Sequence, residues 1–269
     1  MTVLEVEKQG PIAIVTLNRP ARRNSFTPEM LVRLADAWDD IEADPAIRVA
    51  VLTGAGDAAF CSGGDLAELV PLATGARPPE NDWDHRFLAD SRSILNRALL
   101  RRTDFYKPLI AAITGDAFAG GTEITLSADI RIASETARFA LPEVRRGIIP
   151  SGGSLARLAR QIGWTATMEL ILVAEPITAA HAREVSLVNR VVPRDQVLAT
   201  SLEYAQQIAL GAPFALAKAK EAIVQGSGRS LDEAFLIEAG CQDLVMASDD
   251  AREGPLAFVE KRAPRWSGR

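Results

Sequence analysis

Two glutamates stand in stretches where a carboxylate is unusual. Glu123 follows a pair of glycines, and Glu143 lies in the segment Phe139-Ala-Leu-Pro-Glu143-Val, so both have mainly apolar neighbours. A glutamate is rarely buried without a partner or a purpose. Two carboxylates can divide the work of a general acid and a general base. The structural alternative is an ion pair with a nearby arginine: Arg131, Arg145 or Arg146.

Two glycine-rich turns accompany these carboxylates. They are Phe60-Cys-Ser62-Gly63-Gly64-Asp65 and Phe118-Ala-Gly120-Gly121-Thr-Glu123, and each follows a stretch typical of a buried strand. Turns without side chains expose backbone N–H groups, and a helix that begins there adds partial positive charge. Two such amides aimed at one point form an oxyanion hole. The alternative is that the glycines only let a strand and a helix pack closely.

Two further motifs have weaker support. The segment Leu52-Thr-Gly54-Ala-Gly56-Asp-Ala-Ala59 fits the dinucleotide pattern G-x-G-x-x-A, but the glycines that follow it disfavour the helix that such a site needs. Gly152-Gly-Ser154-Leu-Ala156 resembles a nucleophile elbow, with His181 downstream. We expect Ser154 to begin a helix. Serine hydrolysis stays open as an alternative, and inhibition by a serine-directed phosphonate would test it.

The composition excludes several classes of protein. The net charge of −5 argues against a nucleic-acid-binding protein. His85 and His181 are the only histidines, which disfavours imidazole catalysis, and Cys61 and Cys241 are too few for a disulfide framework or a sulfur-ligated metal. The longest uncharged stretch, residues 204–217, is shorter than the roughly 20 apolar residues that cross a bilayer. No secretory signal is visible, so we expect a cytosolic protein without membrane insertion.

Helical and strand patterns alternate along most of the chain. They predict a hairpin of residues 3–9 and 12–17, a helix capped by Thr27 that runs to residue 42, strands at 47–53, 109–114 and 129–133, and helices at 84–105 and 120–128. Residues 71–79 predict a mobile surface loop. Beyond Pro193 only helices are expected, beginning near Asp195, Pro213, Ser230 and Asp249. We therefore predict an α/β core at 1–192 and a helical region at 193–269.

With these residues in view, the sequence resembles the crotonase, or enoyl-CoA hydratase/isomerase, superfamily over nearly its whole length. The most specific segments are residues 60–65, 107–123, 139–153 and 253–261, although Ser62 replaces the more usual alanine and Ala119 a common glycine. The resemblance implies an α/β spiral of repeated β-β-α units. It also implies a C-terminal helical region that forms trimers or dimers of trimers, and an acyl-CoA substrate.

The resemblance also assigns roles to single residues. The backbone N–H groups of Ser62 and Gly120 would hold the thioester oxygen. Glu123 would hold and deprotonate a water, and Glu143, with its pKa raised by its apolar setting and by the neighbouring carboxylate, would give a proton to C2. Because the two groups share a water, which of them is the acid and which is the base stays open. Further positions are implied at the coenzyme A moiety: Arg22 and Arg23 at the phosphates, Gly63, Gly64, Asp65 and Leu66 along the pantetheine, and Phe258 and Lys261 from this or a neighbouring subunit.

The implied activity is hydration of a 2-enoyl-CoA at C2=C3, without a metal or redox cofactor. The alternatives are another reaction on the same scaffold, such as dehydration of a 3-hydroxyacyl-CoA like carnitinyl-CoA or double-bond isomerisation, and a non-catalytic acyl-CoA binder. The insertion of residues 71–84 lies where family members build the acyl pocket, so Trp83 and Phe87 are candidates for its lining or for the core. The acyl group and the choice between trimer and hexamer stay open.

Overall fold

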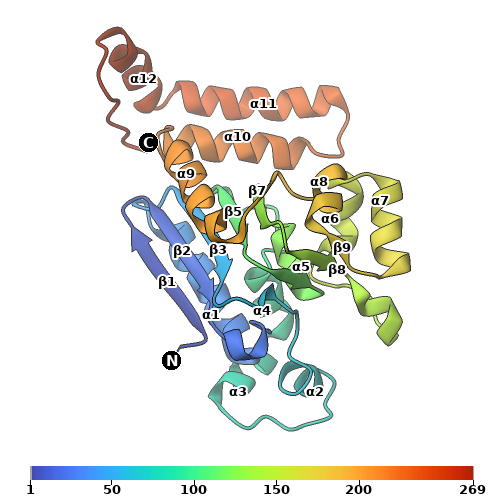
Figure 1. Ribbon diagram of the computed structural model, residues 1–269. Coiled ribbons are helices and arrows are strands. Elements are labelled where there is room, and N and C mark those ends of the chain that lie inside the picture. Colours follow the sequence, from blue (N-terminus) through green and yellow to red (C-terminus); the bar gives the residue numbers. More distant parts are fainter. Residues whose placement is uncertain (1, 269) are drawn as a thin grey trace.

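The computed structural model describes residues 2–268, and its strands form two sheets (Figure 1). The larger sheet has the strand order β1-β2-β3-β5-β7-β10, and the smaller has the order β4-β6-β8-β9. The strands are β1 Leu4–Gln9, β2 Ile12–Leu17, β3 Val49–Gly54, β4 Ala59–Cys61, β5 Leu109–Ile113, β6 Asp116–Phe118, β7 Ile130–Ser134, β8 Arg138–Ala140, β9 Ile177–Thr178 and β10 Arg190–Val192.

The chain winds as a spiral that passes from one sheet to the other. The strands β3, β5 and β7 enter the larger sheet in parallel, and each is followed within a few residues by a strand of the smaller sheet, β4, β6 or β8. Helical segments connect these strand pairs. The predicted spiral of β-β-α units is therefore confirmed, although the short strands of the smaller sheet were not recognised in the sequence.

The helices cover both sides of this framework. The α-helices of residues 2–268 are α1 Pro28–Ala43, α2 Leu69–Ala73, α3 Asp82–Ala89, α4 Ser91–Ala98, α5 Gly120–Thr125, α6 Ser154–Gln161, α7 Trp164–Met168, α8 Ala179–Glu184, α9 Val197–Ala209, α10 Pro213–Gly226, α11 Leu231–Met246 and α12 Asp250–Val259. Short 3₁₀ helices span Pro20–Arg22, Pro142–Arg146 and Arg194–Gln196, and a π-helix spans Glu169–Val173. None of the helices in this part of the chain has the length and apolar character that crossing a membrane requires.

The strands β2, β3 and β5 of the larger sheet are buried on both faces, which explains their nearly continuous apolar sequences. Successive side chains of a strand point to opposite faces. In β2, Ala13 and Val15 face the main core, whereas Ile12 and Ile14 face a second apolar cluster that α9 covers with Ala205 and other side chains. The two sets of side chains fix the register of the strands that carry the site.

The N-terminal elements agree with the sequence prediction. Strands β1 and β2 form an antiparallel hairpin in which Leu4 pairs with Leu17. Helix α1 begins at Pro28, and the Thr27 hydroxyl accepts a hydrogen bond from the Met30 N–H at 3.1 Å. This is the expected N-cap with proline at the first helical position.

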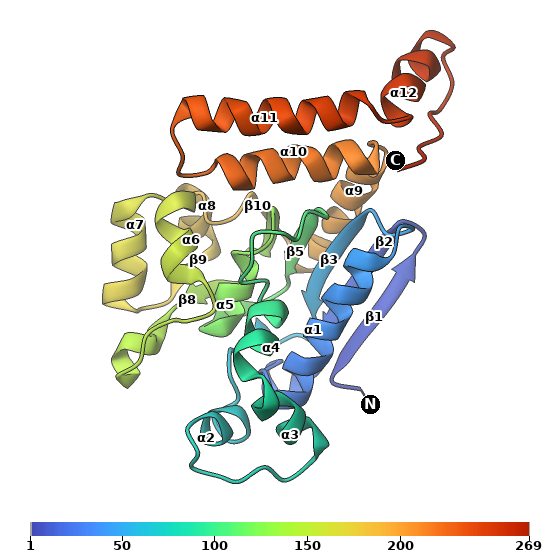
Figure 2. The same ribbon diagram turned by 180° about the vertical axis from the view of Figure 1, so that it is seen from behind.

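The C-terminal part contains only helices, as predicted. Helices α10 and α11 lie side by side beyond one end of the sheets, and α12 extends past them (Figures 1 and 2). The Ser230 hydroxyl and the Glu233 carboxylate form a capping box at the start of α11. The boundary between residues 192 and 193 as a division into two regions stays a prediction.

One prediction in the middle of the chain was wrong, and another was right only in part. The helix expected at 84–105 is two helices, α3 and α4, because Asp90 has a non-helical backbone with a φ of −153° and a ψ of 57° and uses its side chain to cap the Ser93 N–H. The mobile surface loop expected at 71–79 lies largely at the surface, but its first residues belong to α2. Within this loop, Arg77 forms an ion pair of 2.6 Å with the buried Asp84 of α3, and the mobility of the loop stays a prediction.

Candidate active site

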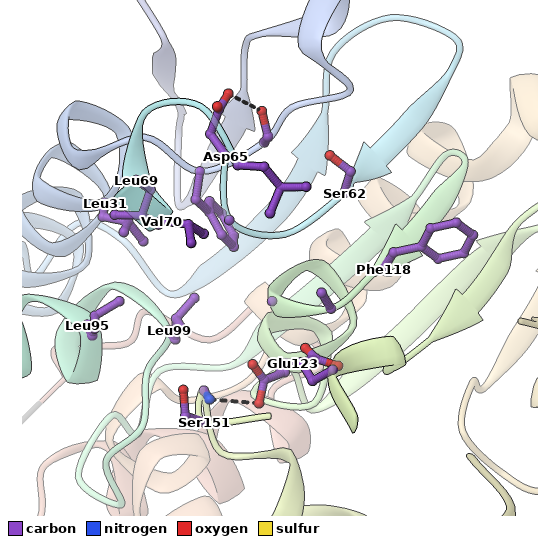
Figure 3. A pocket seen from close by; sticks show the side chains of 18 of the residues that line it. Leu31, Ser62, Asp65, Leu69, Val70, Leu95, Leu99, Phe118, Glu123 and Ser151 are labelled. Atoms are coloured by element: carbon purple, nitrogen blue, oxygen red, sulfur yellow. Dashed lines mark hydrogen bonds between the residues drawn. The ribbon is translucent and has the colours of Figure 1, made fainter. Parts of the chain in front are cut away.

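A cavity of about 870 Å³ lies between the turn after β4, helix α4, helix α5 and the segment after β8. Figure 3 shows Ser62 and Asp65 on one side of it, Glu123 and Ser151 on the opposite side, and Leu95 and Leu99 along a third. Its apolar wall is formed by Phe26, Leu31, Leu69, Val70, Leu95, Leu99, Ile148 and Ile149. Glu123 and Glu143, far apart in the sequence, both line this cavity.

Glu123 is held by donors on one oxygen. Its Oε1 accepts hydrogen bonds from the Gly152 N–H at 2.7 Å, the Ser154 hydroxyl at 2.8 Å and the Ser154 N–H at 3.4 Å. The side chain is 4% exposed and belongs to α5, which approaches β4 so closely that a Cβ on Gly121 would lie 2.0 Å from the Cys61 carbonyl oxygen. Because every neighbour of Oε1 is a donor, Oε2 is the oxygen left for a ligand.

Glu143 has the opposite environment. It lies on the 3₁₀ helix Pro142–Arg146, which ends at Gly147 with a φ of 73°. Its Oε2 is buried and has no hydrogen-bond partner within residues 2–268. Burial raises the pKa of Glu143 to about 7, with a smaller contribution from the negative charge of Glu123. The carboxyl group therefore keeps its proton to a much higher pH than an ordinary glutamate.

The ion-pair alternative is wrong for both glutamates. Neither of them forms a salt bridge in the described part of the chain. Arg145 instead pairs with Glu175, and Arg131 donates to the Gln161 side chain at 2.7 Å. Two carboxylates that differ in hydrogen bonding and share one cavity are suited to opposite proton-transfer roles.

The oxyanion-hole prediction was wrong for Ser62. Its N–H donates to the Arg23 carbonyl at 3.0 Å, and the N–H of Gly63 faces the Cys61 sulfur at 3.4 Å. Beyond them the turn pairs with Phe26: the Gly63 carbonyl accepts from the Phe26 N–H, and the Asp65 N–H donates to the Phe26 carbonyl. Because N–H groups alternate in extended chain, the intervening Gly64 N–H points away from Phe26. Gly64 lines the cavity, and its N–H has no acceptor within residues 2–268.

The backbone N–H of Gly120 has no hydrogen-bond acceptor within residues 2–268, as an oxyanion hole requires. Gly120 is the first residue of α5, where an N–H has no intrahelical acceptor, and it lines the cavity. The preceding residue, Ala119, has a strained backbone with a φ of 52°, which sets the direction of the Gly120 N–H. A 2.8 Å hydrogen bond from the Ala119 N–H to the Ala140 carbonyl holds this conformation. A Cβ on Gly63 would lie 3.0 Å from the Gly120 nitrogen, so the two glycine-rich turns touch.

The predicted coenzyme A residues are only partly brought together. The residues that line the cavity are Arg22, Arg23, Gly64, Asp65 and Leu66. Gly63 does not line it, and its lack of a side chain lets the two glycine-rich turns lie close together. Asp65 stabilises its own loop. Although burial alone would raise its pKa, hydrogen bonds from the Ala67 and Glu68 N–H groups, Arg19 and Ser25 lower it to about 2.

Other predicted residues lie away from the cavity. Phe258 is near the end of α12 and Lys261 follows that helix, and neither of them lines the cavity within this chain. No residue of the insertion 71–84 lines it either. Phe87 belongs to the main core, and Trp83 packs against that core beneath the Arg33 guanidinium. The apolar wall near this insertion comes instead from α4 and from the beginning of α2.

The sequence did not identify the residues that hold Glu123. Gly152 and Ser154 attracted attention only as a near nucleophile elbow. The serine-hydrolase alternative is wrong, because Ser154 is fully buried and bonded to Glu123, while His181 pairs with Glu184 at 3.0 Å. The prediction that Ser154 begins a helix is confirmed by α6.

Cys61 lies directly before the cavity-lining Ser62 and is shielded from the cavity. Its side chain is fully buried, and burial raises the pKa of the thiol to about 12. The thiol is therefore protonated at neutral pH and takes no part in the chemistry of the site.

Comparisons with known proteins agree over the whole chain. The sequence profile of the family described as enoyl-CoA hydratase/isomerase matches residues 7–269. The chain is 42% identical to enoyl-CoA hydratase EchA19 of Mycobacterium tuberculosis, covering 98% of this chain and 96% of that protein. It is 35% identical to the short-chain-enoyl-CoA hydratase of Clostridium acetobutylicum, covering 96% and 94%. A crystal structure of enoyl-CoA hydratase from Bacillus anthracis matches with a TM-score of 0.89 at 34% identity, covering 99% of this chain and 100% of that one.

Proposed function

This chain belongs to the enoyl-CoA hydratase/isomerase family and is a hydro-lyase, and we propose that Glu123 and Glu143 together add water to the C2=C3 bond of a 2-enoyl-CoA thioester. One observation carries the assignment of residues. In a single cavity, one carboxylate has one oxygen held by two short hydrogen bonds, while the other keeps a buried oxygen without a partner and a raised pKa.

The thioester oxygen binds between the N–H groups of Gly64 and Gly120. As water adds at C3, negative charge moves from the double bond onto this oxygen. Two fixed amides stabilise that charge without reorganisation, and each is worth about 10²–10³-fold in rate. This replaces the donor pair Ser62 and Gly120 with the pair Gly64 and Gly120, because Ser62 is already bonded to Arg23.

The two carboxyl groups then complete the addition. Glu123 Oε2 takes a proton from the attacking water, whose oxygen bonds to C3. The protonated Glu143 gives its proton to C2, and the enolate returns to a thioester. In the reverse direction the same groups exchange roles, as microscopic reversibility requires.

The coenzyme A moiety needs cations at its phosphates. Arg22 and Arg23 line the cavity from the 3₁₀ helix that precedes α1 and form no ion pair within residues 2–268, which supports them as phosphate ligands. Phe258 and Lys261 are too far along α12 to reach the same cavity, so any contribution from them comes from a neighbouring copy of the chain.

Assembly into a homo-oligomer, a trimer or a dimer of trimers, is part of this proposal. The helices α10, α11 and α12 lie beyond the sheets (Figure 2), and each of them exposes large apolar side chains. They include Ile223, Leu231, Phe235, Leu236, Leu244, Met246, Phe258 and Val259. Exposed apolar surface of this extent marks an interaction site.

The remaining proposals concern the setting of the reaction. Hydration transfers no electrons, so we propose that the enzyme works without a redox cofactor or metal, with coenzyme A present only as part of the substrate. We also propose a cytosolic location, which the two free cysteines support.

Hydration of crotonyl-CoA tests the proposal. The reaction is monitored through the loss of the absorbance of the conjugated thioester. Glu123→Gln and Glu143→Gln should each lower kcat by about 10²–10⁴-fold. Glu203→Gln, an exposed glutamate on α9, is the matched control and should keep the wild-type rate. Wild-type rates in both site variants, or tight binding of crotonyl-CoA without turnover in the native enzyme, would contradict the proposal. Identification of a 3-hydroxyacyl-CoA product separates hydration from double-bond isomerisation.

A further inference from the structure

Ser154 begins α6 with its hydroxyl directed at Glu123. The side chain is fully buried, and its Oγ lies 2.8 Å from Glu123 Oε1. The reaction proposed above has no step for this hydroxyl, and the N-terminal position of Ser154 in α6 does not require it. A buried hydroxyl bonded to a carboxylate that acts on the substrate calls for its own explanation.

We infer that Ser154 is a positioning residue, whose hydroxyl sets the rotation of the Glu123 carboxylate so that Oε2 faces the attacking water. The inference rests on the proposed function, because it assumes that Glu123 is the base. It assigns separate duties to the two oxygens of one carboxylate: Oε1 is held by the protein, and Oε2 does the chemistry.

The physical need for such a residue comes from the side chain itself. The terminal torsion of a glutamate has a broad minimum, so its rotamer preference does not fix the carboxylate plane. Of the backbone donors to Oε1, Gly152 is short at 2.7 Å, whereas the Ser154 N–H at 3.4 Å is too long to contribute much. Without the hydroxyl, one short bond would hold the carboxylate, and a single bond leaves it free to turn.

The turn that carries Ser154 is anchored independently of this hydroxyl. Arg157 donates to the Ser127 hydroxyl at 3.0 Å and also to the Leu100 carbonyl. Its guanidinium lies against Gly153, where a Cβ would meet Nη1 at 2.8 Å. We therefore expect Ser154→Ala to keep the turn in place and to remove only the bond to Glu123.

The kinetic test separates positioning from a general structural role. Ser154→Ala should lower kcat for crotonyl-CoA hydration about tenfold, because hydrogen bonds to a charged group are worth that much, with KM changed less than about twofold. KM should be unaffected because Glu123 holds the water and does not bind the thioester. Ser154→Thr keeps a hydroxyl and should recover most of the lost kcat.

Ser201→Ala is the matched control. Ser201 is also fully buried, and its hydroxyl donates to the Val197 carbonyl at 2.8 Å within α9, away from the cavity. It should show a comparable change in Tm and an unchanged kcat.

The outcomes distinguish a failure of the role inferred for Ser154 from a failure of the proposed function. Wild-type kcat in Ser154→Ala, with strong loss in Glu123→Gln, would overturn the role of Ser154 alone. A Thr variant as slow as the Ala variant, or a KM that rises while kcat stays constant, would also overturn it. Wild-type activity in Glu123→Gln would overturn the proposed function and this inference with it.

Discussion

The protonation of Glu143 should set the pH range of the proposed reaction. In that reaction Glu143 donates a proton to C2 and must be protonated in the free enzyme, and burial raises its pKa to about 7. Above that pH the group loses its proton, so kcat/KM for hydration should fall about tenfold per pH unit on the alkaline side. Measurement of kcat/KM between pH 5.5 and 9.5 checks this. A flat profile across that range would contradict the role of Glu143, and the residual activity of Glu143→Gln should lack this alkaline limb.

At the residue scale, the sequence indicated the two candidate catalytic carboxylates. It did not indicate which backbone N–H groups are available to bind the thioester oxygen. The types and neighbours of Glu123 and Glu143 were sufficient to nominate the pair. The choice between Ser62 and Gly64 was not available from the sequence, because it depends on the Arg23 carbonyl, which reaches the turn from a distant segment and takes up the Ser62 N–H. The support of Glu123 by Ser154 was hidden for the same reason.

At the scale of elements, the contact between α5 and β4 determines where Gly120 and Glu123 lie. A methyl group on Gly121 would meet the Cys61 backbone at 2.0 Å, so Gly121→Ala must push α5 away from β4. We expect a loss of about 1–3 kcal/mol in the free energy of unfolding. We also expect kcat/KM to fall by at least about tenfold, because even a small displacement of the groups that act on the substrate lowers the rate of the reaction strongly. Urea denaturation and crotonyl-CoA kinetics measure the two effects.

Gly240→Ala provides the control for this substitution. Gly240 lies inside α11, and nothing lies within 4 Å of the Cβ that alanine would add. Alanine there should stabilise the protein by about 0.5–1 kcal/mol and leave kcat/KM unchanged. Wild-type activity in Gly121→Ala would show that α5 does not need this close packing.

Long periodic elements were predictable, and short ones were not. The hairpin, α1 and the C-terminal helices have strong patterns, and α1 and α11 also begin at side-chain caps, so their types and approximate limits followed from the sequence. The strands β4, β6 and β8 span three residues each, too few for a period to be recognised. The break between α3 and α4 depends on one cap, Asp90, in an otherwise continuous helical pattern.

At the scale of the whole molecule, the exposed apolar face of α10–α12 predicts assembly. Leu236 is 75% exposed, so Leu236→Asp should cost the isolated chain little but should disrupt contacts between copies. Sedimentation should show the wild-type protein as an oligomer of the 28.9 kDa chain and the variant in smaller species. Leu172→Asp, an equally accessible leucine on the π-helix, is the control and should stay assembled. A monomeric wild-type protein would contradict this prediction.

The burial of Cys61 has a consequence for the durability of the enzyme. A 2-enoyl thioester is an electrophile at C3, the carbon that water attacks, and a thiolate would add there to form a stable thioether. Cys61 adjoins the turn that we propose binds this electrophile, yet it is fully enclosed, and its pKa of about 12 keeps it in the unreactive thiol form. We therefore expect the packing of β4 against α5 to protect the enzyme from alkylation by its own substrate.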